Sequence, residues 1–147
     1  MRISTRGSYA MEAVLAMAVL PSDQPVSIRE ISERTQISDN YLEQIFTLLR
    51  TNGIIVSVRG AYGGYLLARP AKQITVGDVL RATEKAISPV PCVNDPTQCT
   101  KNMLCVTRNV WCKLEKTISD TIDHVFIADL VLALSKEESP AASEYSI

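Results

Sequence analysis

Apolar residues recur at spacings of three and four along the first third of the chain, a pattern that predicts amphipathic helices. The first helix is expected from about Gly7 to Leu20, where Pro21 ends it. The second begins at Ser27, whose hydroxyl caps the helix while Glu30 completes a capping box. It is short and ends near Thr35.

A third helix is expected directly after the second. Ser38 is its N-cap, and the acidic Asp39 lies beside the positive end of the helix. Asn52-Gly53 ends it, because glycine readily takes the left-handed conformation at a helix C-terminus. The predicted buried stripe of this helix consists of Leu42, Ile45, Phe46 and Leu49.

A β-hairpin is expected next. Two β-rich runs, Ile54–Val58 and Tyr65–Ala68, flank residues 59–64, of which three are glycine. That composition is typical of a hairpin loop. A fourth helix then runs from Thr75 to about Lys85, with Asp78 in the capping position.

The last third of the chain opens with a proline-broken segment and continues as a long periodic stretch. Helical spacing of apolar residues persists from about Val106 to residue 135, which predicts one helix of about 30 residues, or ~45 Å. A single small core could not cover such a helix, so we expect it to pack against a partner helix. The prediction is a mainly α fold with four parts: a head with a small β-hairpin wing at 1–85, a cysteine-containing loop at 86–105, a dimerisation helix at 106–135 and a flexible tail at 136–147.

The amino-acid composition reduces the number of protein classes that fit the chain. The chain has 46% hydrophobic and 21% charged residues, as expected for one globular domain, and a single histidine, which is little material for acid–base catalysis. No signal peptide or membrane-spanning stretch is recognisable, so a cytoplasmic protein that does not enter membranes is expected. Residues 1–85 carry ten Lys and Arg against eight Asp and Glu, so charge alone does not establish a nucleic-acid partner.

Two short helices joined by Gln36-Ile37 and followed by a hairpin have the order of a winged helix-turn-helix. In that motif the N-terminal residues of the second helix reach base edges in the major groove. Asparagine and glutamine can bond adenine, and Arg50 and Arg59 have the reach and charge for phosphate or the minor groove. A dimerisation or protein-docking module of the same order is the alternative interpretation.

The four cysteines have long intervals between them. Cys92, Cys99, Cys105 and Cys112 are separated by six, five and six residues, whereas zinc sites usually contain pairs two to four residues apart. Thiolates also suit iron–sulfur clusters, and a proline-containing loop can wrap around one. The residues alone leave two interpretations open: a cluster, or small buried thiols.

Four short motifs stand out, namely Arg2–Gly7, Tyr41–Gln44, Ser57–Tyr65 and Ile74–Arg81. Together they resemble the family of the iron–sulfur regulator IscR and the nitric-oxide sensor NsrR, and the resemblance covers roughly residues 1–130. The resemblance implies a homodimeric winged helix-turn-helix repressor or activator bound to a palindromic operator in double-stranded DNA. It implies DNA contacts for most of the expected set, with the residue matching Glu43 tuning site choice. That set is Arg2, Ser38, Asn40, Tyr41, Glu43, Gln44, Arg50, Arg59, Gly60 and Tyr62.

The resemblance also implies that Cys92, Cys99 and Cys105 bind an iron–sulfur cluster, with 2Fe–2S favoured over 4Fe–4S. Here the sequence departs from its relatives, because the first interval is one residue longer and both known fourth ligands are missing. Arg108 replaces a histidine, and Ser8 replaces an acidic residue of the partner subunit. Cys112 is the obvious substitute as fourth ligand, or a buried thiol at the dimer seam. His124 and Glu12 are expected to lie outside the ligand set.

The predicted function is a dimeric DNA-binding regulator whose operator affinity depends on an iron–sulfur cluster that senses cluster status, redox state or nitric oxide. The alternative is a regulator of the same fold without a cluster or with zinc, controlled by a protein partner or thiol oxidation. An enzyme is not expected, because a thiol catalyst needs an activated cysteine pair or a neighbouring histidine.

Overall fold

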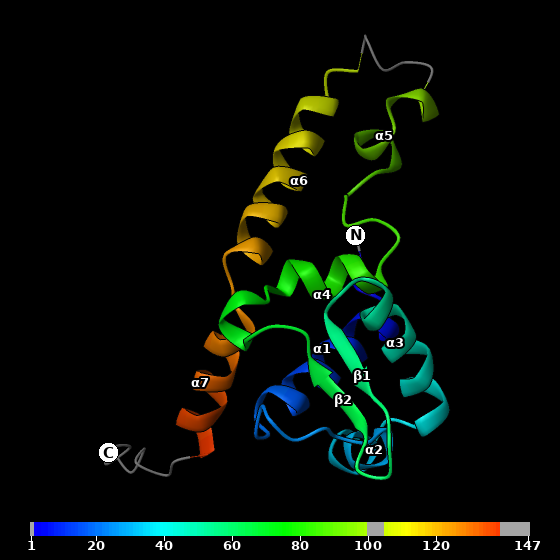
Figure 1. Ribbon diagram of the computed structural model, residues 1–147. Helices are drawn as coiled ribbons and strands as arrows, with labels where there is room; N and C mark the ends of the chain where they lie inside the picture. The colour runs from blue at the N-terminus through cyan, green and yellow to red at the C-terminus, as the bar shows by residue number, and fades with distance from the viewer. Residues whose placement is uncertain (1, 100–104, 139–147) are drawn as a thin grey trace, which may run out of the picture.

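The computed structural model describes residues 2–99 and 105–138 (Figure 1). Side-chain caps fix where the helices begin. Ser4, Ser27, Ser38 and Thr75 each accept a hydrogen bond from the backbone N–H three residues on, which satisfies a donor with no partner inside the helix. The elements are α1 (Thr5–Ala18), α2 (Ile28–Thr35), α3 (Asp39–Thr51), β1 (Ile55–Val58), β2 (Gly64–Leu67), the 3₁₀ turn η1 (Ala71–Gln73), α4 (Val76–Thr83), α5 (Pro91–Asn94), the 3₁₀ turn η2 (Pro96–Gln98), α6 (Arg108–Asp123) and α7 (Ile127–Glu138).

The core of the head lies between α1, α3 and α4. The predicted stripe of α3 is buried in full, and Phe46 meets Tyr65 of β2 edge to face with ring centroids 4.8 Å apart. Fully buried alanines on α1, Ala10 and Ala13, join the same core. Because one side of α3 is committed to this packing, its polar side must face outward.

The hairpin has the predicted position and stands beside the helices. β1 and β2 pair antiparallel with Ile55 opposite Leu67 and Val58 opposite Gly64. Tyr65 also exchanges backbone hydrogen bonds with Val26, the residue before the α2 cap, at 2.8 and 2.9 Å. This bridge ties the base of the hairpin to α2.

The expected single helix over 106–135 is wrong: the stretch forms two helices, α6 and α7, with a break at residues 124–126. At the break the chain pairs with the segment before α4, since Val76 N–H donates to Val125 O at 2.9 Å and Ile127 N–H donates to Ile74 O at 2.8 Å. Ile127 is fully buried in the head. Figure 1 shows α6 projecting beyond the head and α7 continuing alongside it.

The predicted cysteine loop and the predicted tail each lie partly inside and partly outside the described residues. The loop at 86–105 contains the short turns α5 and η2, each begun by a proline, and residues 100–104 lie outside the described residues. The predicted tail begins inside α7, which extends to Glu138, and the rest of it lies outside the described residues as well. None of the described helices combines the length and apolar content that a bilayer span requires.

Candidate DNA-binding surface and cysteine segment

The outward side of α3 carries most of the candidate base-reading residues. Gln36 turns the chain between α2 and α3 in a left-handed conformation (φ 59°), and the adjoining Ser38 caps α3. Tyr41 differs from the other candidates, because it is half-buried and its ring packs edge to face on Tyr9 of α1 at 5.5 Å. The exposed candidates on or capping α3 are Ser38, Asn40, Glu43, Gln44 and Arg50.

The hairpin tip presents Arg59 and Tyr62 to solvent, and Tyr62 is 95% exposed. Glycines shape this tip. Gly60 has φ 117°, and a Cβ on Gly63 would lie 2.2 Å from the carbonyl oxygen of Val58, so neither position accepts a side chain without strain. The tip can therefore bring its backbone close to a partner surface, with a cation and an aromatic ring beside it.

Arg2 stands on the N-terminal arm that leads into α1 and is exposed. The arm is fastened to the end of α4, because the backbone N–H and hydroxyl of Ser4 donate to Glu84 Oε1 at 3.0 and 2.7 Å. Arg6 Nε donates to the carbonyl oxygen of Thr83 at 2.9 Å. Sequence reasoning did not identify Glu84, whose partner lies 80 residues away.

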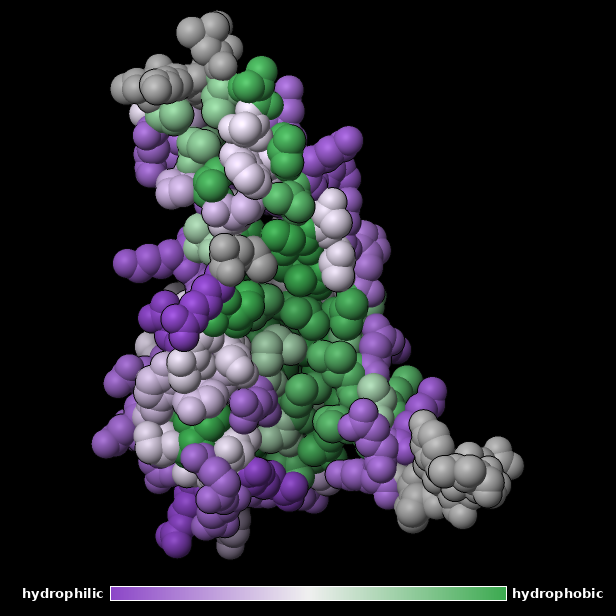
Figure 2. Space-filling view, turned by 180° about the vertical axis from the view of Figure 1, so that it is seen from behind, coloured by the Kyte–Doolittle hydropathy of each residue, from purple (hydrophilic) through white to green (hydrophobic). Residues whose placement is uncertain are grey.

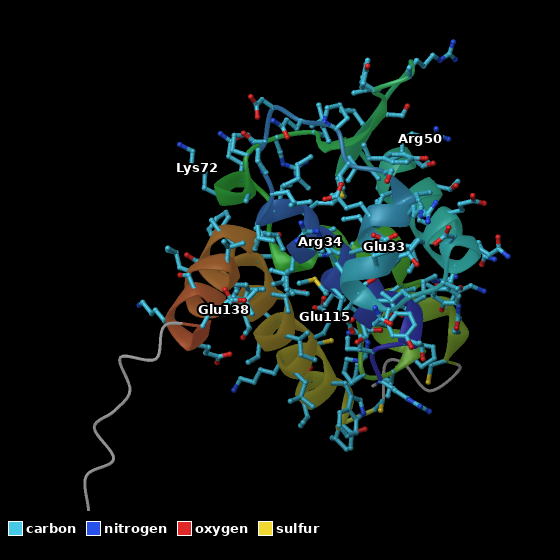
Figure 3. The ribbon with its side chains drawn as sticks, turned by 90° about the horizontal axis from the view of Figure 1, so that it is seen from below. Glu33, Arg34, Arg50, Lys72, Glu115 and Glu138 are labelled. Atoms are coloured by element: carbon cyan, nitrogen blue, oxygen red, sulfur yellow. The ribbon has the colours of Figure 1, made fainter. Side chains whose placement is uncertain are left out.

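Charged side chains are spread around the head rather than gathered at one place. In Figure 3, Arg50 and Lys72 lie toward opposite sides of the head, while Glu33 and Arg34 lie on α2. The two arginines of α2 form ion pairs within the helix, Arg29 with Glu33 and Arg34 with Glu30. Arg59 at the hairpin tip and Arg50 on α3 are exposed and lie on the same elements as the base-reading candidates or next to them. Unlike the arginines of α2, they take part in no ion pair among the described residues.

All four cysteines are free thiols and half-buried. Cys92 lies on α5, Cys99 follows η2, Cys105 precedes α6, and Cys112 lies within α6. α5 packs against α6. Within residues 2–99 and 105–138, no three His, Cys, Asp or Glu side chains gather into a metal-binding group.

Cys105 has the most distinctive surroundings of the four. Its sulfur lies 3.1 Å from the hydroxyl of Thr107. That hydroxyl, the backbone N–H groups of Thr107 and Arg108, and the Arg108 charge together lower the pKa of the Cys105 thiol from its ordinary value. The sequence analysis did not single out Thr107. A hydroxyl two residues after a cysteine at a helix start could have indicated a hydrogen bond to the cysteine sulfur.

The structure also places Arg108 and Ser8, which stand where relatives have the fourth ligand, and His124, which is expected to lie outside the ligand set. The Nε of Arg108 is buried and has no hydrogen-bond partner among the described residues. Ser8 is exposed on α1. His124 follows the last residue of α6, at the opposite end of the helix from Cys112, with Nδ1 2.6 Å from the carbonyl oxygen of Asp120.

A polar recognition helix presented after a tight turn, followed by a glycine-tipped hairpin, defines a winged helix-turn-helix DNA-binding protein. The chain belongs to the Rrf2 family, described as iron-dependent transcriptional regulators, whose profile matches residues 3–133. The predicted fold and the prediction of a transcription regulator rather than an enzyme are thereby confirmed.

Individual relatives agree with this assignment. The transcriptional regulator IscR of Yersinia pseudotuberculosis is 40% identical over 131 residues, which cover 89% of this chain and 79% of that protein. The solved structure of T. potens IscR is 34% identical with a TM-score of 0.73, covering 97% of this chain and 91% of that one. The structure of CymR, the global cysteine regulator of B. subtilis, is 32% identical with a TM-score of 0.73, covering 90% and 98%.

Replacing Thr107 by Val should raise the pKa of the Cys105 thiol, because it removes the hydroxyl that contributes most to lowering it. In cluster-free protein, the rate of Cys105 alkylation by iodoacetamide should then fall at pH 7, and its midpoint in a pH series should move upward. Mass spectrometry of the Cys105 peptide measures both. Thr121→Val, which removes an exposed hydroxyl near the other end of α6, is the control. Equal pH midpoints for wild type and Thr107→Val would contradict the role given to this hydroxyl.

Proposed function

We propose that this regulator binds a palindromic DNA operator as a homodimer, and that an iron–sulfur cluster on the cysteine segment controls its operator affinity. The observation that carries the proposal is the position of the cysteines. Cys92, Cys99 and Cys105 lie between the end of α4, which packs on the recognition helix, and the start of α6, which returns to α4, and Cys112 lies in the first turns of α6. A group that binds this segment is therefore connected to the DNA-reading head at both ends.

Base reading belongs to the N-terminal half of α3. Asn40 and Gln44 are exposed one turn apart, where amides can bond adenine edges, and Glu43 can accept from cytosine. Ser38 and Tyr41 complete the set at the start of the helix. The hairpin tip, the N-terminal arm and the last turn of α3 would position the head through Arg59, Gly60, Tyr62, Arg2 and Arg50.

Cys92, Cys99 and Cys105 are the residues that would hold the cluster. The donor set suits one, since all three are free thiols and the surroundings of Cys105 favour its thiolate form. When bound, an iron–sulfur cluster supplies an iron centre that reacts with oxidants and nitric oxide and can be lost. We favour a 2Fe–2S cluster.

Cys112 is our candidate for the fourth ligand. α6 begins at Arg108, so Cys105 lies before the helix and can turn independently of it. The axial rise from Arg108 to Cys112 is then only about 6 Å, compared with about 10 Å for a helix that began at Cys105. The neighbouring Arg108 carries hydrogen-bond donors and no acceptor, so it cannot take the ligand role.

A second copy of the chain is the partner we propose for α6. Val110 is 53% and Leu114 43% exposed, which leaves large apolar side chains of this helix uncovered. A band of hydrophobic residues continues from the far end of α6 over the middle of the same face toward α7 (Figure 2). Exposed apolar surface of this extent is typical of an interface. A two-fold dimer explains a palindromic operator, because each head then meets one half-site.

Replacing Gln44 by Ala should weaken operator binding about 5- to 150-fold, because a bidentate amide–adenine contact contributes about 1–3 kcal/mol of discrimination. Fluorescence anisotropy with a duplex selected from a random library by the wild-type protein measures the change. Gln24→Ala, an exposed glutamine in the turn after α1, is the matched control. Equal affinities for the two variants would contradict the assignment of α3.

Replacing Leu114 by Glu should convert the dimer to monomers in sedimentation velocity, because it places a charge in the apolar face of α6. Lys116→Glu changes an exposed residue on the opposite side of the same helix and should leave the dimer intact. A Leu114→Glu protein that sediments as a dimer would refute this interface.

Protein purified without oxygen should contain iron and sulfide, and replacing Cys92, Cys99 or Cys105 by Ala should remove most of both. Mössbauer spectroscopy of Cys112→Ala tests the fourth ligand: a changed iron site would support Cys112, and an unchanged spectrum would eliminate it. Wild-type protein without iron or sulfide that still represses normally would end the cluster proposal.

A further inference from the structure

The motif Ile74–Arg81 has no role in base reading or cluster binding, yet most of its residues make specific contacts. Thr75 and Asp78 form a complete capping box for α4, and Asp78 also receives Arg69 Nη2 at 2.8 Å. The backbone on either side of Thr75 bonds to the break between α6 and α7. This segment is therefore where the C-terminal helices are attached to the head.

An ion pair completes the attachment. The two terminal nitrogens of Arg81 donate to the two carboxylate oxygens of Asp123 at 2.5 and 2.9 Å, which joins α4 to the last residue of α6. The pairing lowers the pKa of Asp123, with the Arg81 hydrogen bonds as the largest cause. A bidentate arginine–carboxylate pair fixes orientation as well as distance.

Gly77 lies next to this ion pair in the first turn of α4. A Cβ built there would come 2.0 Å from Asp123 Oδ1 and 2.6 Å from Arg81 Nη1. Glycine inside a helix is less stable than alanine, because it loses more conformational freedom on folding. We account for glycine at this position by the room that the ion pair needs.

α4 connects this ion pair to the recognition helix. It packs on both α1 and α3, with Val79 and Ala82 buried in the same core as Leu49 of α3. Asn52, which ends α3, donates to the carbonyl oxygen of Ala82 at 3.5 Å. A rotation of α6 against α4 can therefore be transmitted to the base-reading side chains through the packing of α4 on α3.

We propose that Arg81, Asp123 and Gly77 form a joint, here called the α4–α6 joint, that transmits the state of the cysteine segment to the recognition helix. The proposal rests on the proposed function and names the positioning residues through which the cluster acts. Both side chains of the pair remain more than a third exposed, and ion pairs of that kind add little to folding stability. Control of orientation explains the arrangement better.

The length of α6 determines how far a small displacement at its cysteine end turns the helix at the joint. Its 16 residues extend about 24 Å from the joint to the cysteine end. A displacement of about 2 Å at that end corresponds to a turn of roughly 5° at the joint. In a dimer, such a turn moves two heads in opposite directions and changes the separation of their recognition helices.

The test measures the coupling factor, defined as the factor by which loading the cluster changes the operator Kd. Arg81→Met removes the charge and keeps the length of the side chain, whereas Gly77→Ala displaces the ion pair without removing either charge. Lys116→Met, which breaks the exposed Lys116–Asp120 pair within α6, is the matched control. Each variant is measured with the same selected duplex, cluster-loaded under anaerobic conditions and cluster-free, and its melting temperature is recorded.

We expect Arg81→Met and Gly77→Ala to lower the coupling factor at least threefold while iron content stays at the wild-type level. Lys116→Met should keep the wild-type factor, and the charge exchange Arg81→Asp with Asp123→Arg should restore part of it. A wild-type factor well above one that survives in both variants would overturn the joint alone. A wild-type factor of one would overturn the proposed function and the joint together.

Discussion

The packing of α4 between the recognition helix and the corner of α6 and α7 is the constraint on which the rest of the structure depends. On one side, Val79 and Ala82 share the core that fixes α3. On the other, the backbone next to Thr75 pairs with residues 125–127, and Arg81 pairs with Asp123. Glu84, the residue directly after this helix, holds the N-terminal arm through Ser4 and leads into the cysteine segment. The recognition helix, the N-terminal arm, the cysteine segment and α6 are thus all attached to one helix of eight residues.

The attachment of these segments to α4 suits a DNA-binding protein whose own net charge is small. The chain has a formal charge of −1, and the recognition helix carries Asp39 and Glu43 as well as Arg50. Sequence-independent attraction to phosphate is therefore modest, because it grows with the number of cations at the interface. In the proposed dimer, affinity would come from well-placed contacts made by both heads at once. A turn of a few degrees between the head and α6 would then change operator binding strongly, which is how we propose that a cluster on the cysteine segment controls it.

Features set by near neighbours in the chain were predictable from the sequence, and features set by distant partners were not. The caps at Ser27, Ser38 and Thr75, the buried stripe of α3 and the glycine hairpin all depend on residues a few positions apart, and the structure has them. The predicted capping box at Ser27 is incomplete, because the Glu30 carboxylate pairs with Arg34 instead of returning to the backbone N–H of Ser27. The break after α6 was missed, because helical periodicity continues through it while its cause is pairing with a segment fifty residues earlier. The contacts Arg81–Asp123 and Ser4–Glu84 were invisible for the same reason, and so was the half-burial of Tyr41 against Tyr9.

In the proposed mechanism, a cluster on the cysteine segment sets the separation of two recognition helices. Pulsed electron–electron spin resonance measures that separation directly. A spin-labelled unnatural amino acid at Thr47, exposed on α3, leaves the cysteines free for the cluster. We expect the distance distribution between the two labels of a dimer to shift when the cluster is removed. Identical distributions for cluster-loaded and cluster-free protein would contradict it.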